Sequence, residues 1–294
     1  MCGLKPVDLL CLAYLMLIVI LIFVGQTTFP YWKIHALLHL ILIVSLIFFV
    51  SKMKDLISKN IFLFIRTFYP VAIIIFSWIE LRHLRGKVTF LLDLTPIILK
   101  TEDYLFGLDN LDFFRKSSPP WLKEIFSFFY LSYYLYLPAA TIPFYLKKRY
   151  ALTASIIFLV TLIYLSNFLF FYLFPSLSPN YLNLSWSKNR EEDTALFLSS
   201  LIDFIQEKEG VRGAAFPSSH LSAATGLTLS CWRYRSPFAL VLSVFLPLIA
   251  LAAINLGYHH AIDCLTGLLM GGLFYWLGLK ILKKQEKKNQ PMII

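Results

Sequence analysis

Long runs of apolar residues, separated by short polar segments, make up most of the chain. A helix that crosses the hydrocarbon core of a bilayer needs about 20 predominantly apolar residues. By that measure the pattern predicts eight membrane-spanning helices, at about residues 7–24, 34–50, 61–79, 121–145, 150–174, 216–232, 237–256 and 260–281. The sixth of these runs is short for a span. The pattern therefore predicts an all-α fold, a multi-pass transmembrane helical bundle.

Two longer segments, at about residues 80–120 and 175–215, interrupt this series. The first contains Val88–Leu99, which is apolar but too short to span, so we expect an interfacial or re-entrant piece there. The second is the most polar part of the chain, and its pattern predicts one amphipathic helix near Thr194–Glu207.

Composition and charge support the membrane interpretation. Hydrophobic residues are 58% of the 294 residues, against roughly 45–50% in an average soluble domain. The formal net charge of +10 would also suit binding to nucleic acid or to a membrane surface. The basic residues, however, lie mainly in short loops between apolar runs, where they set the orientation of membrane proteins. We therefore predict membrane lipids, and no nucleic acid, as partners.

The charges in the loops orient the predicted spans. Four segments that lie inside when the N-terminus is inside are all basic, as the positive-inside rule requires, at residues 51–60, 147–149, 233–235 and 283–288. Arg82, Arg85 and Lys87 lie outside in this arrangement, but in a long loop, where the rule is weaker. The hairpin of the sixth and seventh spans then has its tip inside and both open ends outside. We expect a protein of the plasma or inner membrane.

A short polar motif lies at each open end of this hairpin. The first reads Pro217-Ser218-Ser219-His220, at the start of an apolar run. The first turn of a helix leaves backbone N–H groups unpaired, and with the Ser218 and Ser219 hydroxyls it forms a site suited to an anion. A serine helix cap with an interfacial histidine is the alternative for this motif alone.

The second motif contains His259 and Asp263. Within a helix, their spacing of four residues would place both side chains on one face. A carboxylate that accepts one ring N–H fixes the histidine tautomer and leaves the other nitrogen as a base or nucleophile. His260 would point about a quarter-turn away, so we assign it an accessory role. Because both motifs lie on the same outer face, the sequence predicts an active site there that includes His220.

A metal centre is the alternative use of two histidines and one aspartate. No recognised zinc-binding spacing is present, and the four cysteines show none either. We therefore predict no metal and no cofactor, and keep a metal-dependent hydrolase as a minor alternative.

The two motifs together, Pro217-Ser218-Ser219-His220 and Gly257-Tyr258-His259-x-x-x-Asp263-x-x-x-Gly267, resemble the second and third motifs of the type 2 phosphatidic acid phosphatase (PAP2) superfamily. In that family the third-motif histidine attacks phosphorus and forms a phosphohistidine. The aspartate orients that histidine, and the second-motif histidine protonates the leaving group. By resemblance these roles belong to His259, Asp263 and His220, and Ser218 and Ser219 hold the phosphate.

The resemblance also implies a division of the chain. It comprises N-terminal spans with an interfacial segment (1–99), a catalytic membrane domain with a six-helix PAP2-like core (100–282), and a basic cytoplasmic tail (283–294). The active site is expected on the non-cytoplasmic face, with a lipid phosphate ester of the outer leaflet as substrate.

Three weaker segments resemble the branch that contains the inositol phosphorylceramide synthases and their bacterial relatives. They are Asp103–Gly107, the aromatic run Phe128–Pro138, and Phe174–Pro179. This branch implies transfer of a headgroup to a lipid hydroxyl, as on the sphingolipid precursor ceramide, whereas the wider superfamily implies hydrolysis by water. The predicted site residues are compatible with either acceptor, and we place the broader phosphatase or phosphotransferase activity first.

The sequence departs from the phosphatase pattern in its basic residues. The lysine and arginine of the first motif are not found, and Ala253 occupies the position of the third-motif arginine. Phosphoryl transfer needs positive charge near the non-bridging oxygens. We expect it from Arg212, eight residues before His220, and then from Lys188 and Arg190. The missing arginines also keep open a non-catalytic lipid transporter or scaffold.

Overall fold

The computed structural model describes residues 4–52, 58–84, 92–182 and 196–289. Within these ranges the chain is almost entirely helical, and the isolated β-bridge between Ser176 and Ala214 is parallel. The predicted all-α class is therefore confirmed.

The N-terminal part forms three long helices. They are α1 (Pro6–Val24), α2 (Trp32–Lys52) and α3 (Lys59–Leu84). Two short helices follow, α4 (Thr95–Phe106) and α5 (Leu108–Lys116). The predicted interfacial piece at Val88–Leu99 begins outside the described residues and continues into α4.

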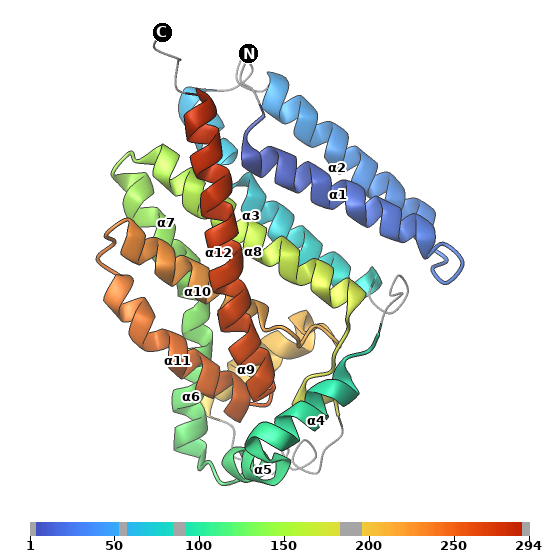
Figure 1. The fold of residues 1–294 in the computed structure, drawn as a ribbon, viewed down its shortest axis with the longest axis vertical. Coiled ribbons are helices and arrows are strands. Elements are labelled where there is room, and N and C mark those ends of the chain that lie inside the picture. Colours follow the sequence, from blue (N-terminus) through green and yellow to red (C-terminus); the bar gives the residue numbers. More distant parts are fainter. Residues whose placement is uncertain (1–3, 53–57, 85–91, 183–195, 290–294) are drawn as a thin grey trace.

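The remaining helices surround the two polar motifs. They are α6 (Pro120–Ser132), η2 (Tyr133–Leu135), α7 (Tyr136–Leu146), α8 (Tyr150–Leu173), η3 (Pro179–Tyr181), α9 (Phe197–Glu209), α10 (Ser219–Arg233), α11 (Ala239–Asn255) and α12 (Ala261–Asn289). Figure 1 shows α12 crossing the molecule along its long axis, with its first turns near α4. Helix α9 occupies the place of the predicted amphipathic helix and exposes the apolar side chains of Phe197, Leu201 and Phe204.

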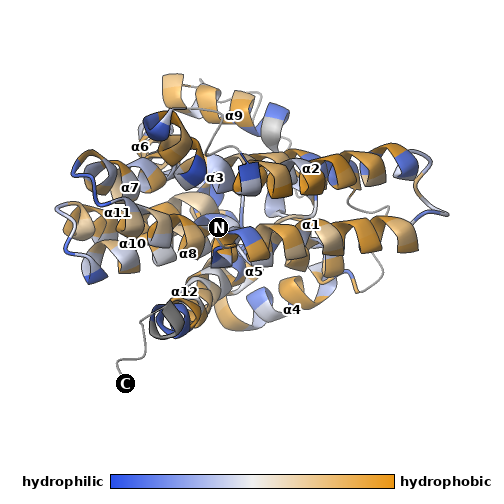
Figure 2. Cartoon of the chain, turned by 90° about the horizontal axis from the view of Figure 1, so that it is seen from above, coloured by the Kyte–Doolittle hydropathy of each residue, from blue (hydrophilic) through white to orange (hydrophobic). Residues whose placement is uncertain are grey.

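Six segments among the described residues are helical, long and apolar enough to cross a membrane. They are α1, α2, α3, the continuous unit from α6 to α7 (Pro120–Leu146), α8, and the Ala261–Glu286 part of α12. Figure 2 shows hydrophobic residues covering these helices and hydrophilic residues gathered towards many helix ends and loops. These features indicate an integral membrane protein and match six of the eight predicted spans.

The other two predicted spans are shorter helices. Helix α10 has 15 residues and α11 has 17. At about 1.5 Å per residue, α10 is shorter than the roughly 30 Å hydrocarbon core. The sequence pattern placed the start of α10 too early, because the first predicted residues, Phe216–Ser218, belong to the preceding loop.

Small residues allow α12 to pack closely against α10. A Cβ on Gly267 would lie 2.6 Å from the Ser218 carbonyl oxygen, and a Cβ on Gly271 would lie 2.9 Å from the Cβ of Thr225. Glycine permits such close backbone approach between membrane helices. The contact matters because α10 and α12 carry the two polar motifs at their N-terminal ends.

Two neighbouring glycines of α12 provide a matched test of this contact. Gly271→Ala places a methyl group against α10, and overpacking of this kind typically costs about 1–3 kcal/mol. Gly272→Ala meets nothing within 4 Å and should leave stability unchanged, or raise it by up to about 1 kcal/mol through helix propensity. We expect a lower thermal unfolding midpoint in detergent for Gly271→Ala alone. Equal midpoints for the two variants would contradict the close contact.

Candidate active site

The loop after α8 joins the two loops that carry the polar motifs. Ser176 N–H donates to the Gly213 carbonyl at 3.1 Å, and Ala215 N–H donates to the Ser176 carbonyl at 3.3 Å. The Ser176 hydroxyl oxygen accepts from Phe216 N–H at 2.8 Å. These bonds fix the loop before α10 against the end of α8.

The same segment holds the loop before α12. Asn180 N–H donates to the Gly257 carbonyl at 3.1 Å, and the Asn180 side-chain amide donates to the Leu256 carbonyl at 3.1 Å. Gly257 has φ 73°, a backbone conformation that favours glycine. Ser218 N–H also donates to the Asp263 carbonyl at 3.0 Å, which joins the two motifs directly.

His259 lies at the end of this loop, before α12 begins at Ala261. Its Nδ1 lies 3.0 Å from the Ala215 carbonyl oxygen. A carbonyl oxygen only accepts hydrogen bonds, so the proton is assigned to Nδ1 and the lone pair to Nε2. His259 Nε2 lies 3.4 Å from Nδ1 of His220. In this assignment the lone pair on His259 Nε2 faces the N–H on His220 Nδ1.

Asp263 is close to His259 but bonds elsewhere. Its Oδ2 lies 3.7 Å from His259 Nδ1 and accepts from His260 N–H at 2.8 Å. This is the pattern of an acidic residue in the first helical turn that caps the residue before the helix. The sequence analysis expected Asp263 to accept the His259 ring N–H. The geometry differs because His259 precedes the helix, so the spacing of four residues does not place the two side chains as it would within a helix.

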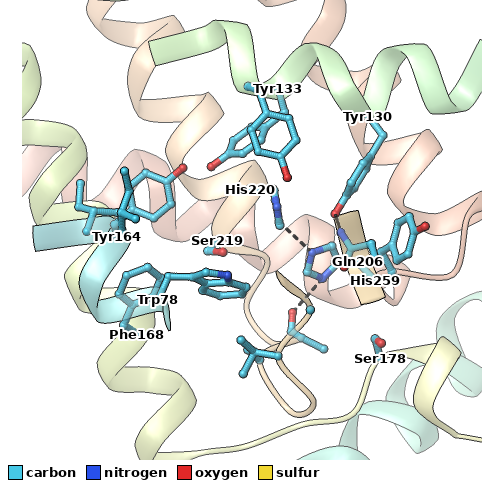
Figure 3. A pocket seen from close by; sticks show the side chains of 18 of the residues that line it. Trp78, Tyr130, Tyr133, Tyr164, Phe168, Ser178, Gln206, Ser219, His220 and His259 are labelled. Carbon is cyan, nitrogen blue, oxygen red and sulfur yellow. Dashed lines mark hydrogen bonds between the residues drawn. The ribbon is translucent and has the colours of Figure 1, made fainter. Parts of the chain in front are cut away.

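His220 is the second residue of α10 and lies among aromatic rings. The ring centroid of Tyr133 is 4.6 Å from that of His220, and the centroid of Tyr130 is 5.5 Å away. Figure 3 shows His220 and His259 facing each other, with these tyrosines beside them. The arrangement brings together two of the three predicted catalytic side chains in direct contact, with Asp263 behind His259.

Both histidines line a cavity of about 1100 Å³. Its described lining contains two carboxylates, Asp203 and Glu207 of α9, and no lysine or arginine. The Tyr258 hydroxyl donates to Asp203 at 3.0 Å, and the Gln206 amide donates to the Tyr130 hydroxyl at 3.2 Å. Among these lining residues, positive charge is therefore available only from protonation of the histidines.

A family model described as the PAP2 superfamily matches residues 104–277. The chain belongs to the PAP2 superfamily. Searches of curated proteins and of solved structures found no match. The matched segment includes His220, His259 and Asp263, and superfamily membership indicates phosphatase-type activity on lipid phosphates. Helices α1 to α3 lie before the matched segment.

The residues predicted to bind phosphate lie in different places relative to the cavity. Ser219 lines the cavity, whereas Ser218 is fully buried behind it and its hydroxyl oxygen accepts from Leu221 N–H at 3.4 Å as the cap of α10. Arg212 is exposed and does not line the cavity. Lys188 and Arg190 lie outside the described residues. Among the described residues, no group of three or more His, Cys, Asp or Glu side chains is arranged to hold a metal ion.

A buried residue that the sequence analysis did not select holds the loop of His259 in place. Glu102 of α4 accepts from Ala261 N–H at 2.6 Å, and its other oxygen pairs with Nδ1 of His260. Glu102 and His260 are both almost completely buried. The accessory histidine therefore faces away from the cavity and anchors the start of α12, next to His259.

A buried cation, Arg115 of α5, lies behind the site. Its Nε–H donates to the Ile254 carbonyl at 3.0 Å. Burial lowers the pKa of Arg115, and the negative charges of Glu102, Asp112 and Asp263 act in the opposite direction. Arg115 does not line the cavity, so it balances the buried carboxylates from behind the site. No local motif marks Glu102 or Arg115, because both act through contacts with residues more than 130 positions away.

The Glu102–His260 pair predicts a pH dependence of stability. Burial lowers the pKa of His260, but the hydrogen bond to Glu102 and the charges of Asp263 and Glu102 outweigh burial and raise the pKa from its ordinary value of 6.5. The folded protein therefore holds this proton more tightly than the unfolded chain. The resulting stabilisation is complete below about pH 6.5 and is lost as the pH rises through the raised pKa.

Glu102→Gln keeps an acceptor for Ala261 N–H but removes the charge beside His260. We expect thermal unfolding midpoints, measured between about pH 5 and pH 9, to fall less steeply with pH in Glu102→Gln than in the wild type. Asp109→Asn removes an exposed carboxylate of α5 and serves as the control, with an unchanged profile. A Glu102→Gln profile parallel to that of the wild type would contradict the assignment.

Proposed function

We propose that this chain is a membrane-embedded lipid-phosphate phosphatase or phosphotransferase that works through a phosphohistidine at His259. The observation that carries this proposal is the contact between His259 Nε2 and His220 Nδ1, 3.4 Å apart at the wall of a large cavity. One nitrogen has a lone pair and the other a proton. A nucleophile and an acid placed together in this way suit attack on a phosphate ester.

In the first half-reaction a substrate phosphate takes the place of the hydrogen bond between the histidines. His259 Nε2 forms a bond to phosphorus, and the bond from phosphorus to the ester oxygen breaks. His220, protonated on both ring nitrogens once the anionic phosphate is bound, gives its Nδ1 proton to that oxygen. The alcohol therefore leaves neutral and His220 becomes a neutral imidazole. The His259 ring becomes positively charged, and the Asp263 carboxylate, 3.7 Å from Nδ1, stabilises that charge.

In the second half-reaction His220 acts as the base. Its Nδ1 takes a proton from water, the water oxygen bonds to phosphorus, and the bond from phosphorus to His259 breaks. Inorganic phosphate leaves and both histidines return to their starting states. Backbone N–H groups in the first turn of α10, beside Ser219, lie at a helix N-terminus that favours negative charge on the non-bridging oxygens. Arg212, Lys188 and Arg190 stay predicted sources of further positive charge.

A headgroup transferase resembling the inositol phosphorylceramide synthases is the second candidate. It shares the first half-reaction and replaces water by a lipid hydroxyl, such as that of ceramide. The resemblance of Asp103–Gly107, Phe128–Pro138 and Phe174–Pro179 to that branch is what supports this candidate. A non-catalytic lipid transporter or scaffold would keep the cavity without using the histidines.

We further propose that α10 and α11 enter the bilayer together as a hairpin and complete the eight predicted spans. The active site then lies on the non-cytoplasmic face of a plasma or inner membrane. The basic residues at the end of α12 support this orientation, because α12 begins beside His259 and leads away from the site.

His259→Ala removes the proposed nucleophile and should abolish turnover, whereas His220→Ala should lower the rate by about 10²–10⁴-fold. Purified variants in detergent with EDTA would be assayed on lipid phosphates and phosphoinositides, with and without ceramide or diacylglycerol. Free phosphate and new lipid species would be measured together. His83→Ala, a change to an exposed histidine that does not line the cavity, is the matched control and should keep full activity.

The products distinguish the candidates. Phosphate release that is lost in His259→Ala indicates a phosphatase, and a new lipid that forms only with an added lipid alcohol indicates a transferase. If wild type and His259→Ala behave alike on every substrate, the catalytic proposal fails and the scaffold gains support.

A further inference from the structure

One wall of the cavity comes from helix α3, which lies outside the segment that matches the PAP2 superfamily. The five residues of α3 that line the cavity are Val71, Ile74, Ile75, Trp78 and Ile79. Their spacing places them on one face of the helix. All five are apolar or aromatic, so the N-terminal part of the chain contributes a continuous hydrophobic surface to the same cavity as the histidines.

Apolar residues of the matched segment complete this end of the cavity. Leu137, Tyr164, Phe168 and Leu227 line it, and the rings of Phe168 and Trp78 lie 5.7 Å apart. Figure 3 shows Trp78, Tyr164 and Phe168 to one side of the two histidines and Gln206 to the other. The cavity is therefore amphipathic, with a hydrophobic end at α3 and a polar end at α9.

Ionic contacts on its other sides hold α3 in position. Arg66 donates to both carboxylate oxygens of Asp8 in α1, at 2.7 and 2.5 Å. Glu80 pairs with His35 at 2.9 Å and with His39 at 3.0 Å, both in α2. The Asp8 and Glu80 carboxylates are buried, and breaking such pairs is costly, so the position of α3 is well determined.

The C-terminal end of α3 is also hydrogen-bonded to α9, which forms the polar wall of the cavity. The Arg82 guanidinium donates to the carbonyl oxygens of Glu207, at 3.1 Å, and Lys208. These carbonyls end helix α9, where a cation is favourable. The contact sets the spacing between the two walls.

We propose that the α3 face is an acyl-chain site, which binds one fatty-acyl chain of the substrate lipid while its phosphate lies at His259. This inference rests on the proposed function and adds the part of the chain that selects the lipid tail. A lipid leaving the bilayer gains little hydrophobic free energy in such a site, because bilayer tails are equally apolar. Recognition therefore depends on how well the chain fits between α3 and α8.

Ile75→Trp tests the site by filling it. Ile75 lines the cavity and is 56% exposed, whereas Ile61, also on α3, is 54% exposed and does not line it. Ile61→Trp is thus a control with the same substitution, helix and exposure. The two substrates are dioleoyl and dihexanoyl phosphatidic acid, which share a headgroup and differ in chain length.

We expect Ile75→Trp to lower kcat/KM for dioleoyl phosphatidic acid by about tenfold or more, and for the dihexanoyl lipid by less than about twofold. Ile61→Trp should leave both values within about twofold of wild type. An equal loss on both substrates, or an equal effect of the two variants, would overturn the acyl-chain site.

A binding measurement separates this inference from the proposed catalysis. Phosphatidic acid with a photoreactive diazirine in one acyl chain would be cross-linked to the His259→Ala protein, and labelled peptides identified by mass spectrometry. Labelling on α3 at Ile75 and Ile79 that competes with unlabelled dioleoyl phosphatidic acid is expected. Labelling confined to the outer surfaces of α1 and α2 would overturn the inference. Cross-linking does not depend on turnover, so it tests acyl-chain binding at α3 even if the wild type hydrolyses neither substrate.

Discussion

The arrangement of the site depends on one hydrogen bond, from His259 Nδ1 to the Ala215 carbonyl. It joins the loop before α12 to the loop before α10, and it fixes the tautomer that leaves Nε2 facing His220. The bond can form only if α10 and α12 approach closely, which Gly267 and Gly271 permit. Because lipid tails provide no hydrophobic drive for helix association, this approach relies on packing and on polar contacts between the loops.

Buried charge is the second requirement for the site, and it follows from the first. A loop held between helices near a membrane cannot turn its backbone groups to water, so they need internal partners. Glu102 supplies one for Ala261 N–H, and Asp263 supplies one for His260 N–H. Two buried carboxylates are costly alone, and the nearby Arg115 together with the His260 ring reduces that cost. The charge network thus keeps the loop of His259 rigid without entering the cavity.

Local features of the sequence predicted much of this structure. Apolar runs located the helices, and His220 and His259, which were expected to share one site, lie in contact. The start of α12 at Ala261 was harder to predict, because capping and loop contacts decide it rather than periodicity, and the His259–Asp263 geometry depends on it. Glu102 and α3 could not be assigned to the site, since their roles arise only when distant segments pack together.

The boundary of the family match is therefore not the boundary of the site. The histidines and the polar wall come from the matched segment, but five residues of the apolar wall come from α3. Helix α9 is held at both ends, with Glu124 of α6 accepting from Leu198 N–H at 2.6 Å and Arg82 of α3 donating at the other end. A change in the position of α3 would move the end of α9 with it, through Arg82. The N-terminal helices consequently determine the shape of the space in which the two histidines act.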